Sequence, residues 1–545
     1  MKRIYGNTRG LKANQIHRLE RLYRRRIPTE LLITHQLARD ISRLSDEIRR
    51  QVGLMINRLG KITHVIVGDF QRILIPDIGE YRTAPGRLRG LRCIHTHLTN
   101  ESITPDDLTD LALLKLDIMG VIRVKDAKPF KVFVSHILPK HSGSRFYNIL
   151  ETLDPNRLNI DCLELIHALE AELAYKRSSY DAFSGIERAI LVSVSRACGH
   201  RWKESLAELE ELALSCGIDV AGKLLQQRLK IDSRFLLGPG KLQDLSISAL
   251  QNGATLIIFD QELNPSQVRA ITDRLDLKVI DRTQLILDIF AQRAQTREGK
   301  LQVELAQLKY LLPRLIAKNT AMSRLTGGIG GRGPGETKLE INRRRARDRI
   351  GQLEKSLSLV MEQRKQQRAK RHKRGLPVIS IIGYTNAGKS TLLNTLTKSH
   401  VLTESRLFAT LDPTSRRLKF PKDIEVIITD TVGFIKDLPQ DLRAAFRATL
   451  EELEHAGLLL HVIDISHPCF QDHIEAVETI LAELNLTHIP LLRVLNKQDL
   501  VKTEKVKKLE QRLEGIAISA KDESTLTVLI KKMQIKLQPT PSKKY

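Results

Sequence analysis

The chain has 545 residues, enough for about three or four domains that each bury a hydrophobic core. Hydrophobic residues make up 41% of the sequence and no run of about 18 uncharged apolar residues occurs, which argues against a membrane span. Lysine and arginine exceed aspartate and glutamate by 88 − 63 = 25, so we expect a polyanionic partner such as RNA, DNA or an anionic membrane. The alternative is that this charge serves only solubility.

The amino terminus and the cysteines indicate a cytoplasmic protein. The first ten residues, MKRIYGNTRG, are basic but lead into no apolar segment of a signal peptide. Five cysteines are odd in number and scattered, and none is paired as CxxC, so we expect buried, reduced thiols. They are Cys93, Cys162, Cys198, Cys216 and Cys469.

Two α/β regions are expected in the first half of the chain. Residues 1–186, an amino-terminal extension, contain the basic helical stretch NQIHRLERLYRRR, the strand-like THVIVGD and the helical ELIHALEAELAYKR. In residues 187–296 the pattern restarts with the strand-like AILVSVS, a helix over 203–215, and the apolar runs TLIIFD and LKVID. This glycine-containing second region is therefore also predicted to be an α/β domain.

Residues 297–374 are predicted to form a basic helical hairpin. One helix is expected over 297–319 and another over 339–371, joined by the glycine-rich TGGIGGRGPGETK. Between Lys338 and Arg374 there are 14 basic and 4 acidic residues, a net charge of 14 − 4 = +10. Because few aromatic side chains are available for base stacking, the hairpin favours contact with RNA phosphates over base recognition. A solvated helix face is the alternative.

The last region, 375–545, opens with a phosphate-binding motif. The strand-like PVISII leads directly into GYTNAGKS and then into the helical TLLNTL, which is the context a P-loop requires. Backbone N–H groups of such a loop surround the phosphates, Lys389 neutralises β and γ charge, and the Ser390 hydroxyl ligates Mg²⁺. The expected loop residues are Gly383, Tyr384, Thr385, Asn386, Ala387, Gly388, Lys389 and Ser390.

A second motif predicts the base. The strand-like IPLLRVL runs into Asn496, Lys497, Gln498 and Asp499, an NKxD pattern. The Asp499 carboxylate can accept from both N1–H and the exocyclic amine of guanine, whereas adenine offers neither donor there. GTP is thus expected over ATP. Asn496 would brace the P-loop, the Lys497 stem would cover the ring, and the triplet Ser519, Ala520 and Lys521 would present backbone N–H groups to the guanine carbonyl.

The segments between these motifs are expected to respond to the γ-phosphate. Asp430, Thr431, Val432 and Gly433 follow the strand-like IEVIIT; Asp430 would hold Mg²⁺ through water and the Gly433 N–H would sense the phosphate. A preceding segment comprises Phe408, Ala409, Thr410, Leu411 and Asp412, in which Thr410 would join Ser390 as a metal ligand. Lys389, Thr410 and Gly433 are the predicted catalytic residues, with a plain loop threonine as the alternative for Thr410.

Phe434 stands where Ras-like enzymes place a water-orienting glutamine. A phenyl ring cannot orient water, so intrinsic hydrolysis is expected to be slow and the missing group must come from a partner, another loop or a cation. Asn386 could help to hold K⁺ near the phosphates, or it could simply brace the loop.

From about residue 187 to its end, the chain resembles GTPases of the HflX family, within the translation-factor class of P-loop proteins. The resemblance rests on FLLGPGKL, IDRTQLILDIFAQRAQTREGKLQVELAQL, GGIGGRGPGETKLE, GYTNAGKS, FATLDPT, DTVGF and NKQD. It implies an α/β multidomain fold: an α/β domain with a long helical hairpin, then a P-loop GTPase domain of mostly parallel sheet with helices on both faces.

The resemblance also implies a function. We expect a monomeric GTPase that binds the large ribosomal subunit and ribosomal RNA, hydrolyses GTP to GDP and phosphate, and acts in ribosome rescue, splitting or recycling under stress. The alternative is a ribosome-assembly or RNA-binding factor whose GTPase only reports occupancy.

Within the amino-terminal extension, His95, His97, Thr104 and Asp107 resemble a degenerate JAMM metalloprotease motif, in which two histidines and an aspartate bind zinc. Leu98 replaces the usual proline, the spacing to Thr104 is one residue short, and no upstream glutamate is evident. We therefore interpret the pair as structural histidines, with a metal site as the alternative.

The hairpin tip, residues 327–335, surrounds Arg332 with glycines and Pro334. Helices rising about 1.5 Å per residue would carry such a tip tens of Å outward, where glycine backbone can approach RNA closely and Arg332 can pair with phosphate. The resemblance places that RNA in the region of the peptidyl transferase centre. A connector without a binding role is the alternative.

Replacing residues 327–335 by a serine-rich linker of equal length is expected to leave intrinsic GTP hydrolysis nearly unchanged, because the tip carries no catalytic side chain. Ribosome-stimulated hydrolysis or ribosome splitting should be lost, as measured by phosphate release and by sucrose-gradient sedimentation. Full ribosomal activity in this variant would show that the tip is not needed for the action on the ribosome.

Overall fold

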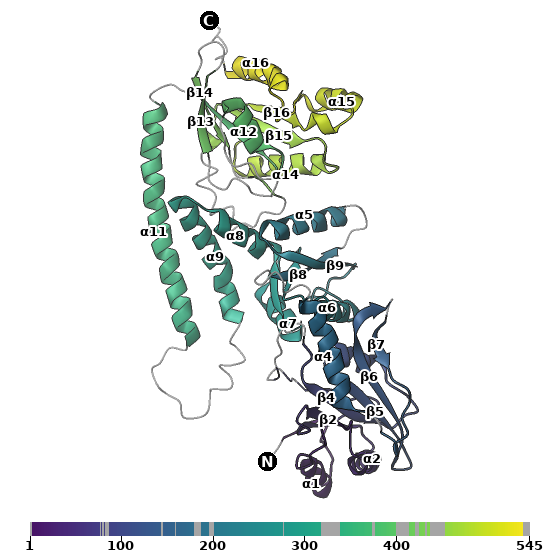
Figure 1. The fold of residues 1–545 in the computed structure, drawn as a ribbon. Helices are drawn as coiled ribbons and strands as arrows, with labels where there is room; N and C mark the ends of the chain where they lie inside the picture. Colours follow the sequence, from purple (N-terminus) through teal and green to yellow (C-terminus); the bar gives the residue numbers. More distant parts are fainter. Residues whose placement is uncertain are drawn as a thin grey trace. The chain divides into compact units, whose positions relative to one another are not determined.

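A computed structural model shows an α/β multidomain chain, as the sequence predicted (Figure 1). The described residues are 3–76, 78, 81, 87–142, 145–158, 160–178, 187–195, 201–275, 277–317, 338–372, 377–398, 414–419, 425–430, 433–435 and 453–537. None of the helices in this part of the chain is both long and apolar enough to cross a membrane.

The chain divides into two compact units, within which residues contact one another far more than they contact the other unit. The first comprises residues 1–207 and 217–280, and the second comprises residues 208–216 and 281–545. Among the described residues, the first unit contains two β-sheets, and the second contains a third sheet and two long helices. The four-domain division predicted from the sequence remains a prediction at its finer boundaries.

A seven-stranded mixed sheet forms the amino-terminal part of the first unit, in the order β1-β3-β2-β4-β5-β6-β7. The β1/β3 and β4/β5 pairs are parallel, and the other pairs are antiparallel. Its strands are β1 (Ile4–Gly6), β2 (Val52–Asn57), β3 (Ile62–Val67), β4 (Leu91–His97), β5 (Ile118–Lys125), β6 (Lys128–Ser142) and β7 (Arg145–Ile149). Its helices are α1 (Ala13–Leu22), α2 (His35–Ile48), α3 (Pro105–Leu113) and α4 (Cys162–Ser178).

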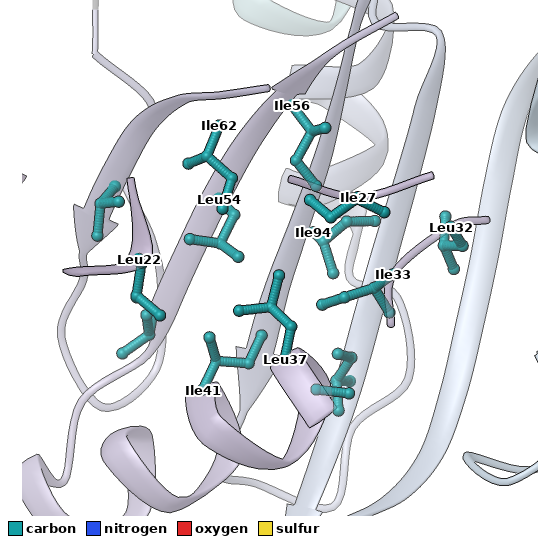
Figure 2. Close-up of a cluster of buried hydrophobic side chains, with 14 of the residues drawn as sticks. Leu22, Ile27, Leu32, Ile33, Leu37, Ile41, Leu54, Ile56, Ile62 and Ile94 are labelled. Atoms are coloured by element: carbon teal, nitrogen blue, oxygen red, sulfur yellow. The ribbon is translucent and has the colours of Figure 1, made fainter. Parts of the chain in front are cut away.

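Both faces of the central strands of this sheet are buried. Because successive side chains of a strand point to opposite faces, alternate residues enter two different hydrophobic cores. Leu54 and Ile94 belong to the cluster packed by α1 and α2, which Figure 2 shows around Leu37 and Ile41. The opposite face carries Met55 and Cys93 of the same strands, together with Leu108 and Leu111 of α3. Alternation therefore places odd-numbered side chains of β4, including His95 and His97, on the α3 face.

The second sheet of this unit has four strands in the order β11-β10-β8-β9. Its pairs β10/β8 and β8/β9 are parallel, and the fully buried run LIIF of β10 is typical of a parallel strand covered on both faces. The strands are β8 (Arg188–Ser195), β9 (Asp219–Gln227), β10 (Leu256–Phe259) and β11 (Lys278–Asp281). The helices that follow them are α5 (Arg201–Ser215), α6 (Pro239–Gln251), α7 (Pro265–Leu275) and α8 (Arg282–Arg293).

Two long helices, α9 (Arg297–Ala317) and α11 (Lys338–His372), lie side by side in the second unit (Figure 1). Arg349 of α11 makes two hydrogen bonds to the Glu304 carboxylate of α9, at 2.7 and 2.9 Å, and Lys309 pairs with Glu354 at 2.7 Å. The two helices of the hairpin thus pair as expected. Its predicted tip, 327–335, lies outside the described residues.

The third sheet has six strands in the order β13-β14-β12-β15-β16-β17 and is parallel except for the edge strand β13. Its strands are β12 (Val378–Gly383), β13 (Thr414–Lys419), β14 (Glu425–Asp430), β15 (Leu458–Asp464), β16 (Leu491–Asn496) and β17 (Ile516–Ala517). Its helices are α12 (Lys389–Thr397), α14 (Phe470–Glu483), α15 (Thr503–Leu513) and α16 (Leu526–Leu537), with the 3₁₀ turns η2 (Leu453–His455), η3 (Gln498–Leu500) and η4 (Glu523–Thr525). Carboxyl ends of parallel strands meet at one edge of the sheet, which is where ligands of such folds bind.

Leu54→Ala is expected to destabilise the amino-terminal sheet by about 2 to 5 kcal/mol, because Leu54 of β2 is fully buried against the α1/α2 layer. The matched control is Leu59→Ala, since Leu59 is 79% exposed in the turn that follows β2. Calorimetric unfolding of both variants measures the difference. Equal unfolding temperatures for the two would contradict the packing of this core.

Candidate nucleotide-binding site

The segment GYTNAGKS forms the turn between β12 and α12, and α12 begins at Lys389. Gly388 has φ +92°, and a Cβ there would lie 2.3 Å from the Asn496 amide nitrogen. Gly383 has φ +152°, and its Cβ would lie 2.3 Å from the Val462 carbonyl oxygen. Both positions therefore require glycine, because any larger residue would push the loop off the neighbouring strands. The amino terminus of α12 is consequently open to an anion.

Lys389 is buried inside this loop. Its Nζ donates to the backbone carbonyls of Gly383, at 3.1 Å, and Tyr384, at 2.7 Å. Burial lowers the pKa of Lys389 to about 8, against the opposing attraction of Asp430. A cation held in a low-dielectric loop interacts strongly with an incoming phosphate, because water screens it poorly.

Ser390 and Asp430 come together as the two motifs predicted. The Ser390 hydroxyl donates to the Asp430 carboxylate at 2.7 Å, and Asp430 ends β14, the strand that pairs with β12. A hydroxyl and a carboxylate are the hard oxygen donors that Mg²⁺ prefers. The two residues present therefore fit that ion, which Ser390 would bind directly and Asp430 would hold through water.

Asn496 joins the phosphate loop to the base-binding loop. It ends β16 and is buried, its side-chain nitrogen donates to the Ala387 carbonyl at 2.7 Å, and its side-chain oxygen accepts from the Ala520 N–H at 2.9 Å. The bracing role expected for Asn496 thus has a direct geometric basis. The tie to Ala520, in contrast, was not part of the expectation.

The three residues that follow Asn496 in the NKxD motif are each held in a different way. Lys497 has φ +62° and pairs through Nζ with Asp464 at 2.6 Å, while Asp499 lies exposed in η3, where its carboxylate is open to a base. Gln498 donates its backbone N–H to the Ile518 carbonyl at 3.2 Å.

In the SAK triplet, Ser519 and Ala520 are buried and Lys521 is exposed. The Ser519 N–H donates to the Thr525 hydroxyl at 3.1 Å, and the Ala520 carbonyl accepts from the Thr395 hydroxyl of α12 at 2.6 Å. The first bond ties the triplet to η4, and the second holds it against α12.

Phe434 packs into the hydrophobic core beside α14 with 3% of its surface exposed. Its backbone pairs with the P-loop, since Thr385 N–H donates to its carbonyl at 2.8 Å and its own N–H donates to Gly383 at 3.1 Å. The adjacent Gly433 lies against the loop; a Cβ on it would be 2.8 Å from Thr385 and 3.1 Å from Lys389 Nζ. Phe434 thus serves packing, while Gly433 is placed beside the phosphate-binding lysine.

Several predicted residues lie outside the described part of the chain. They are Phe408, Ala409, Thr410, Leu411, Asp412, Thr431 and Val432. Among the described loop residues, Asn386 is exposed with φ +61° and Tyr384 is buried. The K⁺ role suggested for Asn386 stays a prediction.

Sequence reasoning missed three residues that support the site. Asp464 pairs with Lys497, Thr395 binds the SAK triplet, and His473 of α14 stacks on the Tyr384 ring with centroids 3.8 Å apart. Only Asp464 carried a usable signal, because it ends the strand-like run HVID and parallel strands present their carboxyl ends to the ligand edge.

Comparison with known proteins supports this reading of the geometry. Three family models match the chain: "GTP-binding GTPase N-terminal" over residues 203–291, "GTP-binding GTPase Middle Region" over 293–371, and "50S ribosome-binding GTPase" over 378–497. The GTPase HflX of Caldanaerobacter subterraneus subsp. tengcongensis is 50% identical over 315 residues, which cover 58% of this chain and 73% of that protein.

The chain belongs to the HflX family of GTPases. The Escherichia coli K12 member is 46% identical over 322 residues, covering 59% of this chain and 75% of that protein. A crystal structure of a Sulfolobus solfataricus GTP-binding protein with GDP has 25% identity and a TM-score of 0.37, covering 65% of this chain and 99% of that one. As an HflX-family member, this chain is a GTP-binding protein and a GTP hydrolase, as the motifs predicted.

Asp499→Asn is expected to weaken GTP binding by about 2 to 3 kcal/mol, because one charge-assisted acceptor for the guanine edge is lost. Xanthosine triphosphate should bind this variant better than GTP does, and fluorescence titration measures both. Glu504→Gln, at an exposed carboxylate in the first turn of α15, is the matched control and should bind GTP normally. Unchanged GTP affinity for Asp499→Asn would refute the base assignment.

GDP affinity is expected to fall as pH rises above about 8, the pKa of Lys389 without nucleotide. A bound phosphate raises that pKa, so the complex takes up a proton; affinity is complete below this pKa and falls by up to about tenfold per pH unit above it. Isothermal titration in two buffers of different ionisation enthalpy counts the protons. Equal binding enthalpies in the two buffers near pH 8 would contradict the lowered pKa.

Proposed function

We propose that this HflX-family GTPase is a GTP-switched factor of the large ribosomal subunit that acts in ribosome rescue, splitting or recycling under stress. The GTP-bound form binds ribosomal RNA, and hydrolysis to GDP and phosphate permits release. The proposal makes the chain a cytoplasmic protein that works as a monomer on its ribosomal target.

The observation that carries this proposal is the strongly basic hairpin beside a GTPase domain whose family model is described as "50S ribosome-binding GTPase". Arg345 and Arg347 of α11 are exposed, while Arg349 is engaged with Glu304 of α9. Ion pairs thus join α9 and α11, while exposed arginines of α11 stay available to bind the phosphates of an RNA backbone.

The chemistry of hydrolysis follows from the nucleotide site. Lys389 binds the β- and γ-phosphates, the Gly433 N–H donates to the γ-phosphate, and Asp499 reads guanine. Ser390, with Thr410 and the water-bridged Asp430, would hold Mg²⁺, which neutralises charge developing between the phosphates. Because Phe434 is packed in the core, the group that orients the attacking water must come from the ribosome, another loop or K⁺. Slow intrinsic turnover with ribosomal stimulation is the expected result.

The binding surface can be tested by charge reversal on α11. Arg345→Glu with Arg347→Glu is expected to lower affinity for the large subunit by about tenfold or more and to reduce its salt dependence, because RNA phosphate contacts are lost. Lys507→Glu with Lys508→Glu, on the exposed face of α15, changes the net charge equally and serves as the matched control. Intrinsic GTP hydrolysis should be normal in both variants.

Affinity is measured by sedimentation with large subunits and a non-hydrolysable GTP analogue, and splitting is measured with intact ribosomes in the same buffer. Equal weakening by both double variants would mean that only net charge matters and would contradict a hairpin binding surface. Binding to immature large subunits without splitting of intact ribosomes would favour the assembly-factor alternative.

A further inference from the structure

A second cluster of ligand-type side chains lies far from the nucleotide motifs in the sequence, in the amino-terminal sheet. His95 and His97 are on β4 and Asp107 is in the first turn of α3, and all three are buried. The two histidines share a face of the strand because side chains alternate with a period of two residues. That face is the one α3 covers.

The three side chains converge on one point. His95 Nε2 lies 3.0 Å from His97 Nε2 and 3.1 Å from Asp107 Oδ1, and His97 Nε2 lies 3.5 Å from Asp107 Oδ2. In a tetrahedral zinc site with bonds of about 2.0 to 2.1 Å, neighbouring donor atoms are separated by about 3.3 Å. The observed separations bracket that value.

The orientation of the carboxylate is set by the helix start. Thr104 is the N-cap of α3, and both its backbone N–H and its hydroxyl donate to Asp107 Oδ2 at 2.8 Å. This capping box turns the other oxygen, Oδ1, toward His95. Hydrogen bonds of this kind to a ligating carboxylate are a usual feature of metal sites, because they keep the ligand in one orientation.

A fourth buried polar side chain lies on the same face. Gln51 is 1% exposed, and neither its amide nitrogen nor its amide oxygen has a hydrogen-bond partner among the described residues. Gln51 directly precedes β2, in which Val52 and Leu54 point into the α1/α2 core, so alternation puts its side chain toward the α3 face, where His95 pairs with Gly53. Burying an amide without partners is costly, which indicates that a ligand or an ordered water belongs beside it.

From this geometry we propose that His95 Nε2, His97 Nε2 and the Asp107 carboxylate bind one zinc ion. Two imidazoles and one carboxylate match the donor set of open zinc sites, which keep a fourth position for water or an external ligand. The unpartnered Gln51 amide, on the same face, is the candidate to hydrogen-bond that fourth ligand. An amide cannot act as a general base, so the site binds a ligand or stabilises the domain and does not activate water through Gln51. The proposal takes the metal-site alternative given in the sequence analysis in preference to structural histidines.

The test uses the full-length protein purified without a histidine tag and dialysed with excess Mg²⁺, which keeps the nucleotide site filled with that ion. Mass spectrometry of the metal content is expected to give about one zinc per chain. A strong chelator should remove it, zinc should restore it, and Co²⁺ should replace it with the visible absorption of a tetrahedral nitrogen–oxygen site.

Variants locate the ion. His95→Gln and Asp107→Asn are each expected to lose the zinc and the cobalt spectrum, while GTP hydrolysis stays at the wild-type rate. The matched control is His64→Gln, at a buried histidine on β3 of the same sheet, which β2 separates from β4; this variant should retain one zinc per chain. Zinc should raise the unfolding temperature of the wild type and this control but not of the two ligand variants.

Three outcomes would overturn the proposal. Wild-type protein that holds no metal after zinc is added back would mean that the histidines share a proton with Asp107 and serve structure alone. Stoichiometric iron in place of zinc would overturn the zinc assignment. Equal zinc loss in the His64→Gln control would place the ion elsewhere. The chelator experiment uses only wild-type protein, so the test stands even if a ligand variant fails to fold.

Discussion

The side-chain amide of Asn496 is the interaction on which the nucleotide site depends. Its nitrogen binds the Ala387 carbonyl in the phosphate loop, and its oxygen binds the Ala520 N–H in the base-binding loop. The amide is buried, so both bonds form in a low dielectric, where leaving either group unpaired would be costly. Gly388 completes the arrangement because no other residue leaves room for that amide. Phosphate recognition and guanine recognition are thereby held in one rigid frame.

Within that frame, Lys389 contributes a buried charge and Phe434 contributes packing. Lys389 is kept in the loop by two backbone carbonyls, and burial lowers its pKa, so the loop is prepared to receive a phosphate. Phe434 packs in the hydrophobic core, at the position where Ras-like enzymes have a polar side chain that orients the attacking water. The two facts together describe a loop that is ready for phosphate and a neighbouring position that offers no side chain to orient water.

The amino-terminal sheet follows a different physical principle. Its central strands are buried on both faces, and the α3 face includes two imidazoles, a carboxylate and an unpartnered amide among apolar side chains. Polar groups of this kind are not required to fill a core, since Met55 and Cys93 fill the same face nearby. A bound zinc ion would account for their presence. The proposed zinc site would thus lie in a domain that contains none of the GTPase motifs.

The amino-acid sequence by itself determined the features that depend on contiguous residues. The P-loop lies within eight residues between a strand and a helix, and NKQD follows directly on β16, so their chemistry could be predicted without a fold. The long helices α9 and α11 were also predictable, because helical periodicity and the glycine-rich break between them are local signals.

Tertiary structure decided what depends on residues distant in the chain. Asn496 meets Ala387 across 109 residues, and Lys497 meets Asp464 only because β15 and β16 are parallel neighbours. The strands β4 and β5 were not separated by sequence reasoning, since buried strands lack the alternation that marks a half-exposed one. The convergence of His95, His97 and Asp107 likewise required the register of β4 and the capping box of α3. Spacing along the chain specifies which side chains are available, but distances of a few ångströms are set by packing between elements.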